Sequence, residues 1–198
     1  QHPRTRIGYR VDELVELNAR LAKSDLRIDS VCCRIDGDGQ PIESVDAYQA
    51  LPSLSHIGRV DWLLSLPHLD DEAHALLACR ALFATTALPD GYLFVDPPQD
   101  LDRTMDACHG LLDTRCNPRP AFHALRSLNT LLHAYRGSGY TQTKGAYKMH
   151  SSLGRIELLS ADEEPSLSGQ EVRLYDLVNG TVGKGNDMGD TNAEPTLQ

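Results

Sequence analysis

Side chains able to do acid–base chemistry stand after three apolar segments of the sequence, and one more lies in the loop after the last segment. They are Asp36, His68, Asp96 and Asp100. Carboxylates and imidazoles are common proton-transfer groups in enzymes, and they also hydrogen-bond polar ligands. An Asp after a strand is equally typical of an ordinary turn. The surrounding elements therefore decide whether these residues can form a site.

Helices and strands alternate along the first two thirds of the chain. Strands are predicted where short apolar runs end in turn residues, near 28–35, 60–66 and 91–96. Helices are predicted from apolar residues at helical spacing, over 11–23, 44–58, 68–88 and 120–135. This alternation predicts βα units and a parallel sheet.

The pattern of predicted elements changes after residue 136. Short strands are predicted at 154–160 and 171–178, and Asn179-Gly180 is a strong hairpin-turn signal. We therefore expect an α/β domain over 1–136, a small all-β domain over 137–183, and a flexible tail over 184–198.

The bulk composition excludes some classes of partner. The net charge of −9 argues against a nucleic-acid partner, because phosphate binding needs a basic face. No run approaches the roughly 18 apolar residues of a membrane helix, so we expect no membrane insertion. The chain opens at Gln1 without an apolar leader, which favours a mature, trimmed or internal piece of a longer protein.

The five cysteines have no spacing typical of a zinc site, so we expect neither a metal nor a cofactor. Cys32 and Cys33 would point to opposite faces of a strand. A cluster of Cys108, His109 and Cys116 is less favoured than scattered structural cysteines. A Cys108–Cys116 disulfide stays an alternative.

Three βα units make a very small sheet for this much apolar surface. The chain is therefore expected to be part of a larger fold or to pair with another chain. The alternative is a compact three-layer domain with a β appendage.

Residues 110–126 carry a family resemblance. Gly110-Leu111-Leu112-Asp113, followed by residues 117–126 (NPRPAFHALR), resembles the end of the barrel in clan-A-type (β/α)8-barrel glycoside hydrolases, the β-xylosidase and cellulase-like group. Residues 172–182 (VRLYDLVNGTV) are similar to a sequence motif in the β-sandwich domain that follows such barrels. The resemblance extends over about 71–135 and, more loosely, 154–182.

The resemblance implies an α/β fold, the C-terminal half of a TIM-type (β/α)8 barrel followed by a small all-β domain. The predicted strands would be the sixth, seventh and eighth. Active sites of such barrels lie at the carboxyl ends of the strands, so Asp36, His68, Asp96 and Asp100 become candidate substrate-binding residues. The implied partners are carbohydrate and the missing barrel half, from the same precursor or another chain. An extracytoplasmic or secreted location is implied by the resemblance alone.

One departure from the family concerns catalysis. The family's nucleophile is a Glu that ends the seventh strand, but this sequence has Leu64-Ser65-Leu66-Pro67-His68 there. We therefore identify no catalytic residue, and enzymatic activity stays open. One hypothesis is a glycoside-hydrolase-like protein that acts on or binds polysaccharide. The other is a catalytically inactive structural or protein-interaction subunit derived from the barrel. An unrelated small α/β protein is a third, less favoured interpretation.

Four further side chains are considered as binding residues and are expected instead to belong to the scaffold. Trp62 and Tyr92 could stack on a sugar, but both lie in apolar runs and are expected in the core. Arg119 and His123 are expected to be solvated on the last helix of the α/β part.

Overall fold

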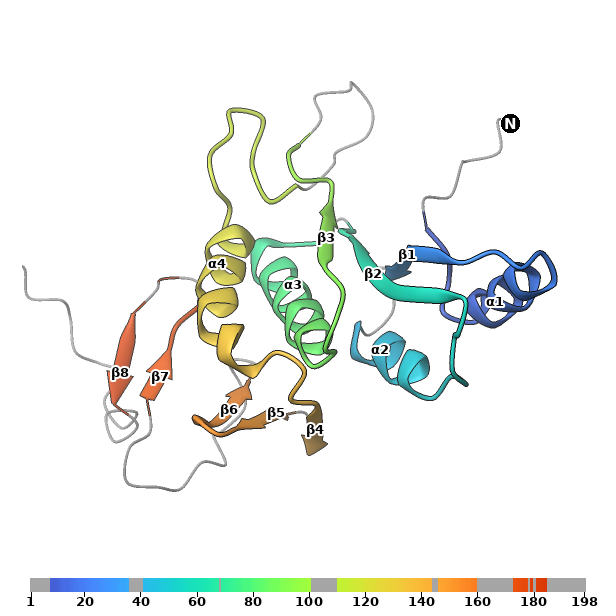
Figure 1. Ribbon diagram of the computed structural model, residues 1–198. Helices are drawn as coiled ribbons and strands as arrows, with labels where there is room; N and C mark the ends of the chain where they lie inside the picture. The colour runs from blue at the N-terminus through green and yellow to red at the C-terminus, as the bar shows by residue number, and fades with distance from the viewer. Residues whose placement is uncertain are drawn as a thin grey trace, which may run out of the picture.

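The computed structural model describes residues 8–35, 41–67, 69–100, 110–143, 146–159, 173–177, 179 and 181–184 (Figure 1). Over these residues the protein is a mixed α/β fold. The α/β part contains α1 (Glu13–Lys23), β1 (Ile28–Ile35), α2 (Pro41–Gln49), β2 (Ile57–Ser65), α3 (Asp71–Thr86), β3 (Leu93–Asp96), α4 (Pro120–Leu132) and the 3-10 turn η1 (His133–Tyr135). The β part contains β4 (Tyr140–Thr143), β5 (Ala146–Ser151), β6 (Gly154–Leu158), β7 (Arg173–Tyr175) and β8 (Val182–Lys184).

The parallel sheet has its strands in chain order, β1-β2-β3. Both pairings are parallel, with Cys33 opposite Trp62 and Trp62 opposite Leu93. Tyr9 makes one further parallel bridge to Cys33 on the other side of β1. Its N–H donates to the Cys32 carbonyl (2.8 Å), and its carbonyl accepts from the Arg34 N–H (2.7 Å). A fourth strand position therefore lies beside β1, and α1 follows it.

One face of the sheet carries the core. Alternate strand residues, such as Cys33, Trp62 and Leu64, are fully buried. The Trp62 ring meets Tyr48 of α2 edge-on, with 5.5 Å between ring centroids. The expectation that Trp62 is a core residue is confirmed.

Helix α3 is the most deeply buried helix along its second half, and its first turn is exposed. Asp70 caps its amino end by accepting a hydrogen bond from the Ala73 N–H (2.8 Å). Along α3, Ala78, Ala81 and Phe83 are fully buried. The helix packs against α4 and both neighbouring strands, so it is the centre of the helical layer.

Within the described part of the chain, the opposite face of the sheet is much less covered. Except for Asp61, its side chains are half-buried or exposed: Ser30, Cys32, Arg34, Arg59, Leu63, Ser65, Tyr92, Phe94 and Asp96. Tyr92 is 54% exposed and Phe94 52%. The prediction that Tyr92 is a core residue is wrong, because strand alternation turns it to this face rather than to the helices. We call this surface the bare face.

The three-stranded antiparallel sheet β4-β5-β6 packs against the helices rather than standing apart. Tyr147, Met149 and Leu158 belong to the same core cluster as the helical residues. The Tyr140 hydroxyl donates to Asp46 of α2, and its ring lies 6.5 Å from Phe83 of α3. Burial and the bond to Asp46 both raise the pKa of Tyr140. The β part is thus fastened to α2 and α3.

The predicted elements are found with shifted bounds. The strand at 28–35 is confirmed as predicted, whereas the helix expected over 44–58 begins at Pro41 and ends at Gln49. The predicted hairpin turn joins β7 to β8, which pair antiparallel. Strands β4 and β5 were not predicted. Of the expected tail, residues 185–198 lie outside the described residues.

Candidate functional site: the carboxyl edge and bare face of the parallel sheet

Asp96 lies at the carboxyl edge of the sheet. It ends β3 opposite Ser65, and its carbonyl accepts a hydrogen bond from the Leu66 N–H (2.8 Å). The residue is exposed, and no described group hydrogen-bonds its carboxylate. Asp36 and His68 follow β1 and β2 in the sequence but lie outside the described residues. Of the two candidate site residues that the structure describes, Asp96 is the one whose carboxylate is available to a ligand at this edge.

Asp100 also lies near this edge, but its carboxylate is used within the fold. One oxygen accepts a hydrogen bond from the Gly110 N–H (2.6 Å), and the other forms an ion pair with Arg119. Its side chain is only 14% exposed. Asp100 therefore anchors the segment that follows β3 to the start of α4.

Arg119 is not the solvated side chain expected from the sequence. It is 25% exposed, pairs with Asp100, and reaches the Asp71 carboxylate at 3.5 Å. The hydrogen bond to Asp100 is the main cause of its raised pKa. Arg119 thus links the loop before α4 to the first turn of α3. This role of Arg119 could not be predicted from the sequence, because its partners Asp100 and Asp71 lie 19 and 48 residues away in the chain.

The structure of this loop explains the sequence motif at 110–120. A Cβ on Gly110 would lie 2.4 Å from the carbonyl carbon of Gln99, so the two backbones approach too closely for any other residue. Asp113 accepts hydrogen bonds from the Arg115 and Asn117 N–H groups and from the Asn117 amide, each 2.8 Å. The bond from the Asn117 side chain is the main cause of the lowered pKa of Asp113. Pro120 then begins α4.

A polar cluster occupies the amino end of the bare face. The buried Asp61 carboxylate accepts from Arg59 Nε (3.2 Å) and from the Tyr92 N–H (3.0 Å). The guanidinium groups of Arg59 and Arg136 lie 5.1 and 5.7 Å from the centroid of the Tyr92 ring. Both distances suit cation–π attraction. Sequence reasoning missed this cluster, although Arg59 and Asp61 two residues apart in an apolar strand are a signal of one polar face.

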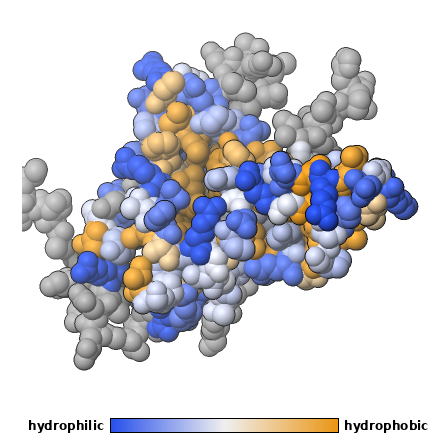
Figure 2. Space-filling model, in the orientation of Figure 1, coloured by the Kyte–Doolittle hydropathy of each residue, from blue (hydrophilic) through white to orange (hydrophobic). Residues whose placement is uncertain are grey.

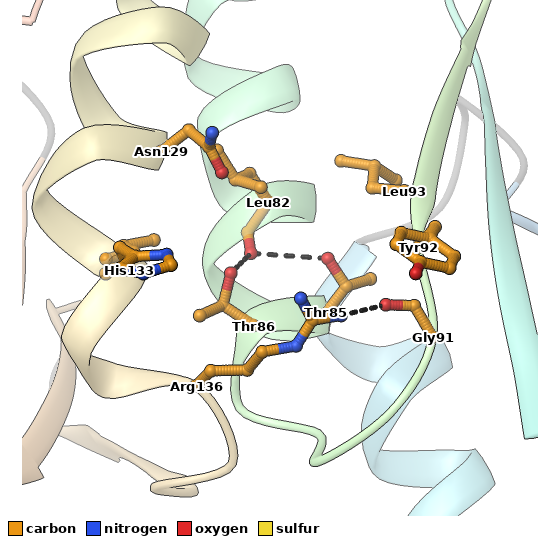
Figure 3. A pocket seen from close by; sticks show the side chains of 10 residues that line it. Leu82, Thr85, Thr86, Gly91, Tyr92, Leu93, Asn129, His133 and Arg136 are labelled. Atoms are coloured by element: carbon orange, nitrogen blue, oxygen red, sulfur yellow. Dashed lines mark hydrogen bonds between the residues drawn. The ribbon is translucent and has the colours of Figure 1, made fainter.

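A small cavity lies on the helix side of the sheet, between α3, α4 and the start of β3 (Figure 3). Its volume is about 180 Å³. Its wall includes Leu82, Leu93 and Leu132, and Arg136 crosses its mouth to donate to the Gly91 carbonyl. The Thr86 hydroxyl beside it donates to the Leu82 carbonyl (2.7 Å). Of the described candidate residues, Asp96 and Asp100 do not line it, whereas Tyr92, considered above as a stacking residue, does.

Retaining glycoside hydrolysis needs two carboxylates about 5 Å apart. At the end of β2 the chain has Ser65, and across from it the end of β3 has Asp96. With Asp100 held by Arg119, the described part of this edge offers one available carboxylate.

Metal-ligating side chains are not grouped in the described part of the chain, where no three His, Cys, Asp or Glu residues are placed to hold a metal ion. Cys108 and His109, which the less favoured cluster and the alternative disulfide both involve, lie outside the described residues. Cys116 is exposed.

Comparisons with known proteins give no match: no family model, no curated protein and no solved structure matches the chain. In the part of the chain that the structure describes, no helix has the length and apolar character needed to cross a bilayer.

Proposed function

We propose that this chain is the C-terminal half of a (β/α)8 barrel. Three features support the proposal. The strands follow one another in chain order, whereas a doubly wound sheet reverses its order at a switch point. The Tyr9 bridge adds one further parallel contact on the outer side of β1, and α1 follows it, as in a preceding βα unit. The third feature is the bare face. Parallel sheets are normally covered on both faces, so this face is expected to be covered by a further part of the fold.

The bare face becomes the barrel interior when four further strands close the sheet. Its carboxyl edge, with Asp96 and the neighbouring Phe94, then lines the barrel mouth, where barrel enzymes bind their substrates. We propose that this mouth binds or acts on polysaccharide or oligosaccharide, in a larger chain or assembly. The observation that carries the proposal is the bare inner face under a polar carboxyl edge. The family resemblance supplies the ligand class.

A catalytically inactive, barrel-derived interaction subunit is the second candidate. The end of β2 favours it, since Ser65 and Leu66 have no group able to form a glycosyl ester. The described end of β2 supplies no nucleophile, so hydrolysis would need another carboxylate beside Asp96. Sugar binding does not need this carboxylate.

Affinity electrophoresis in gels containing soluble xylan or hydroxyethyl cellulose tests the proposal. We expect at least one polysaccharide to retard the protein, and Asp96→Asn to reduce the retardation several-fold. Asp29→Asn is the matched control, because Asp29 is exposed at the opposite end of the sheet, in β1. Equal loss in both variants, or no retardation with any glycan, contradicts carbohydrate binding.

Intact-mass analysis after incubation with 2-deoxy-2-fluoro glycosyl fluorides separates the two candidates. Covalent labelling of the chain or of its completing half supports a retaining hydrolase. Glycan retardation without labelling supports a subunit that binds carbohydrate but does not hydrolyse it by this route.

A further inference from the structure

We infer that the cavity between α3, α4 and the start of β3 binds a small organic carboxylate, with the carboxylate group at the mouth and a ring-sized body inside. The cavity lies at the amino end of β3, away from the carboxyl edge of the proposed polysaccharide site, and the inference does not depend on the half barrel. Its volume is about 180 Å³. An apolar cavity of about 150 Å³ holds a benzene molecule, so this one has room for a six-membered ring with a small substituent.

The charge at the mouth favours an anion. Of the two guanidinium groups beside the Tyr92 ring, that of Arg59 already has a carboxylate, since its Nε lies 3.2 Å from Asp61. Arg136 lies 5.7 Å from the centroid of the same ring and donates to the Gly91 carbonyl, but within the described residues no carboxylate pairs with it. No Asp or Glu is among the residues that line the cavity. Arg136 is thus held in place with N–H donors left for a carboxylate.

Two further polar side chains stand on the same side of the mouth as Arg136. Asn129, near the end of α4, and His133, in η1, precede it by seven and three residues, which places all three on one side of the helical segment. Figure 3 shows them facing the start of β3 across the cavity. The Asn129 amide adds N–H donors beside the guanidinium. The α4 side of the mouth therefore supplies the groups that bind an anion.

The interior suits an uncharged ring. The hydroxyls of Thr85 and Thr86 donate to carbonyls of their own helix, at 2.8 and 2.7 Å. Each hydroxyl has a single donor hydrogen, so neither has one left for an anion deeper in the cavity. Figure 2 shows apolar surface between α4 and β3. The ligand's charged group therefore stays at the mouth, and its ring packs against the apolar side chains of the wall, Leu82, Leu93 and Leu132.

An NMR titration of the backbone amides with sodium benzoate at constant ionic strength tests the inference. We expect saturable shifts of the Gly91, Leu93 and Arg136 amides. Benzamide has the same shape without the charge and should bind at least about tenfold more weakly, because a neutral amide lacks the charge-assisted bond to the guanidinium. Inorganic phosphate, which has the charge without the ring, should also bind more weakly. No saturable shift with benzoate, or equal affinity for benzamide or phosphate, overturns the inference.

Three variants place the bound benzoate. Arg136→Gln should weaken binding at least about tenfold. Arg126→Gln is the matched control, because Arg126 is an exposed cation of α4 that does not line the cavity, and its affinity should be unchanged. Asn129→Trp fills the mouth from an exposed helix position and should abolish binding without removing a charge. Equal weakening by both arginine variants, or unchanged binding to Asn129→Trp, overturns the assignment of the ligand to this cavity.

Discussion

The two faces of the parallel sheet differ although they are made by the same strands. Cys33, next to Cys32 in β1, is fully buried against the helices, while Cys32 is only half-buried on the bare face. Likewise Trp62 is inaccessible, and Phe94 on the neighbouring strand is 52% exposed. The helical face carries the buried core of the sheet. The bare face mixes apolar, aromatic and charged residues, and most of its described side chains are half-buried or exposed.

Truncating one aromatic on each face should give the largest contrast. Trp62→Ala removes a fully buried ring and should lower the free energy of unfolding by about 3–5 kcal/mol. Phe94→Ala removes a half-exposed ring and should cost about 1 kcal/mol or less in dilute protein. Urea titrations followed by far-UV circular dichroism measure both. Equal losses would mean that the bare face is already packed in the single chain.

Breaking the ion pair above the carboxyl edge should have a smaller effect. Arg119→Ala removes the guanidinium that pairs with the partly buried Asp100 carboxylate, which should cost about 1–3 kcal/mol. Arg115→Ala, in the same loop but exposed, should cost less than about 0.5 kcal/mol. The same titrations compare them. If the two variants are equally stable, Arg119 does not hold the loop.

The adjacent cysteines report on the two faces through their alkylation rates. Cys33 is fully buried and Cys79 nearly so, and burial raises the pKa of Cys79 to about 12. Both should stay unlabelled by iodoacetamide while the protein is folded, because the reagent needs an accessible thiolate. Cys32 also has a raised pKa, from burial and from the Asp61 carboxylate. Its half-buried thiol should still react at least about tenfold faster than Cys33.

Peptide mass spectrometry after timed quenching measures these rates, with the exposed Cys116 as the fast reference. A Cys32 rate equal to that of Cys116 would contradict the partial burial of Cys32. A Cys33 rate equal to that of Cys32 would contradict the assignment of the two residues to opposite faces.

The smallest effect should come from alkaline pH at the junction of the β part with the helices. Burial, followed by the bond to Asp46, raises the pKa of Tyr140 in the folded protein. Its contribution to stability is therefore fully present below the unfolded tyrosine pKa, about 10, and is lost as pH rises through the higher folded value. Tyr140→Phe should flatten the loss of stability above about pH 10. Denaturant titrations on either side of that pH measure this, and an unchanged slope would contradict it.

The regular elements of the α/β part follow from local patterns, and most of the candidate site does not. The strand Ile28–Ile35 and the Pro120 start of α4 could be predicted because apolar runs and turn residues mark them. Strands β4 and β5 are rich in polar residues, and it is their packing on α2 and α3 that makes them strands.

The side-chain roles at the carboxyl edge depend on distant partners. The sequence predicts Asp100 as a loop carboxylate, but the fold brings Arg119 beside it. The sequence predicts Tyr92 as a core residue, but the strand turns its side chain outward. The Gly110 requirement likewise comes from the backbone at Gln99, in the segment that leaves β3. Such contacts have no local sequence signal.

The chain-order arrangement of β1, β2 and β3 also bears on how the protein folds. Each strand pairs with the one before it, so every step of sheet growth closes a loop of only one βα unit. Paired positions such as Cys33 and Trp62 are closer in sequence than they would be if the sheet order skipped a strand, and lower sequence separation favours faster folding. Assembly of the sheet can therefore proceed unit by unit along the polypeptide.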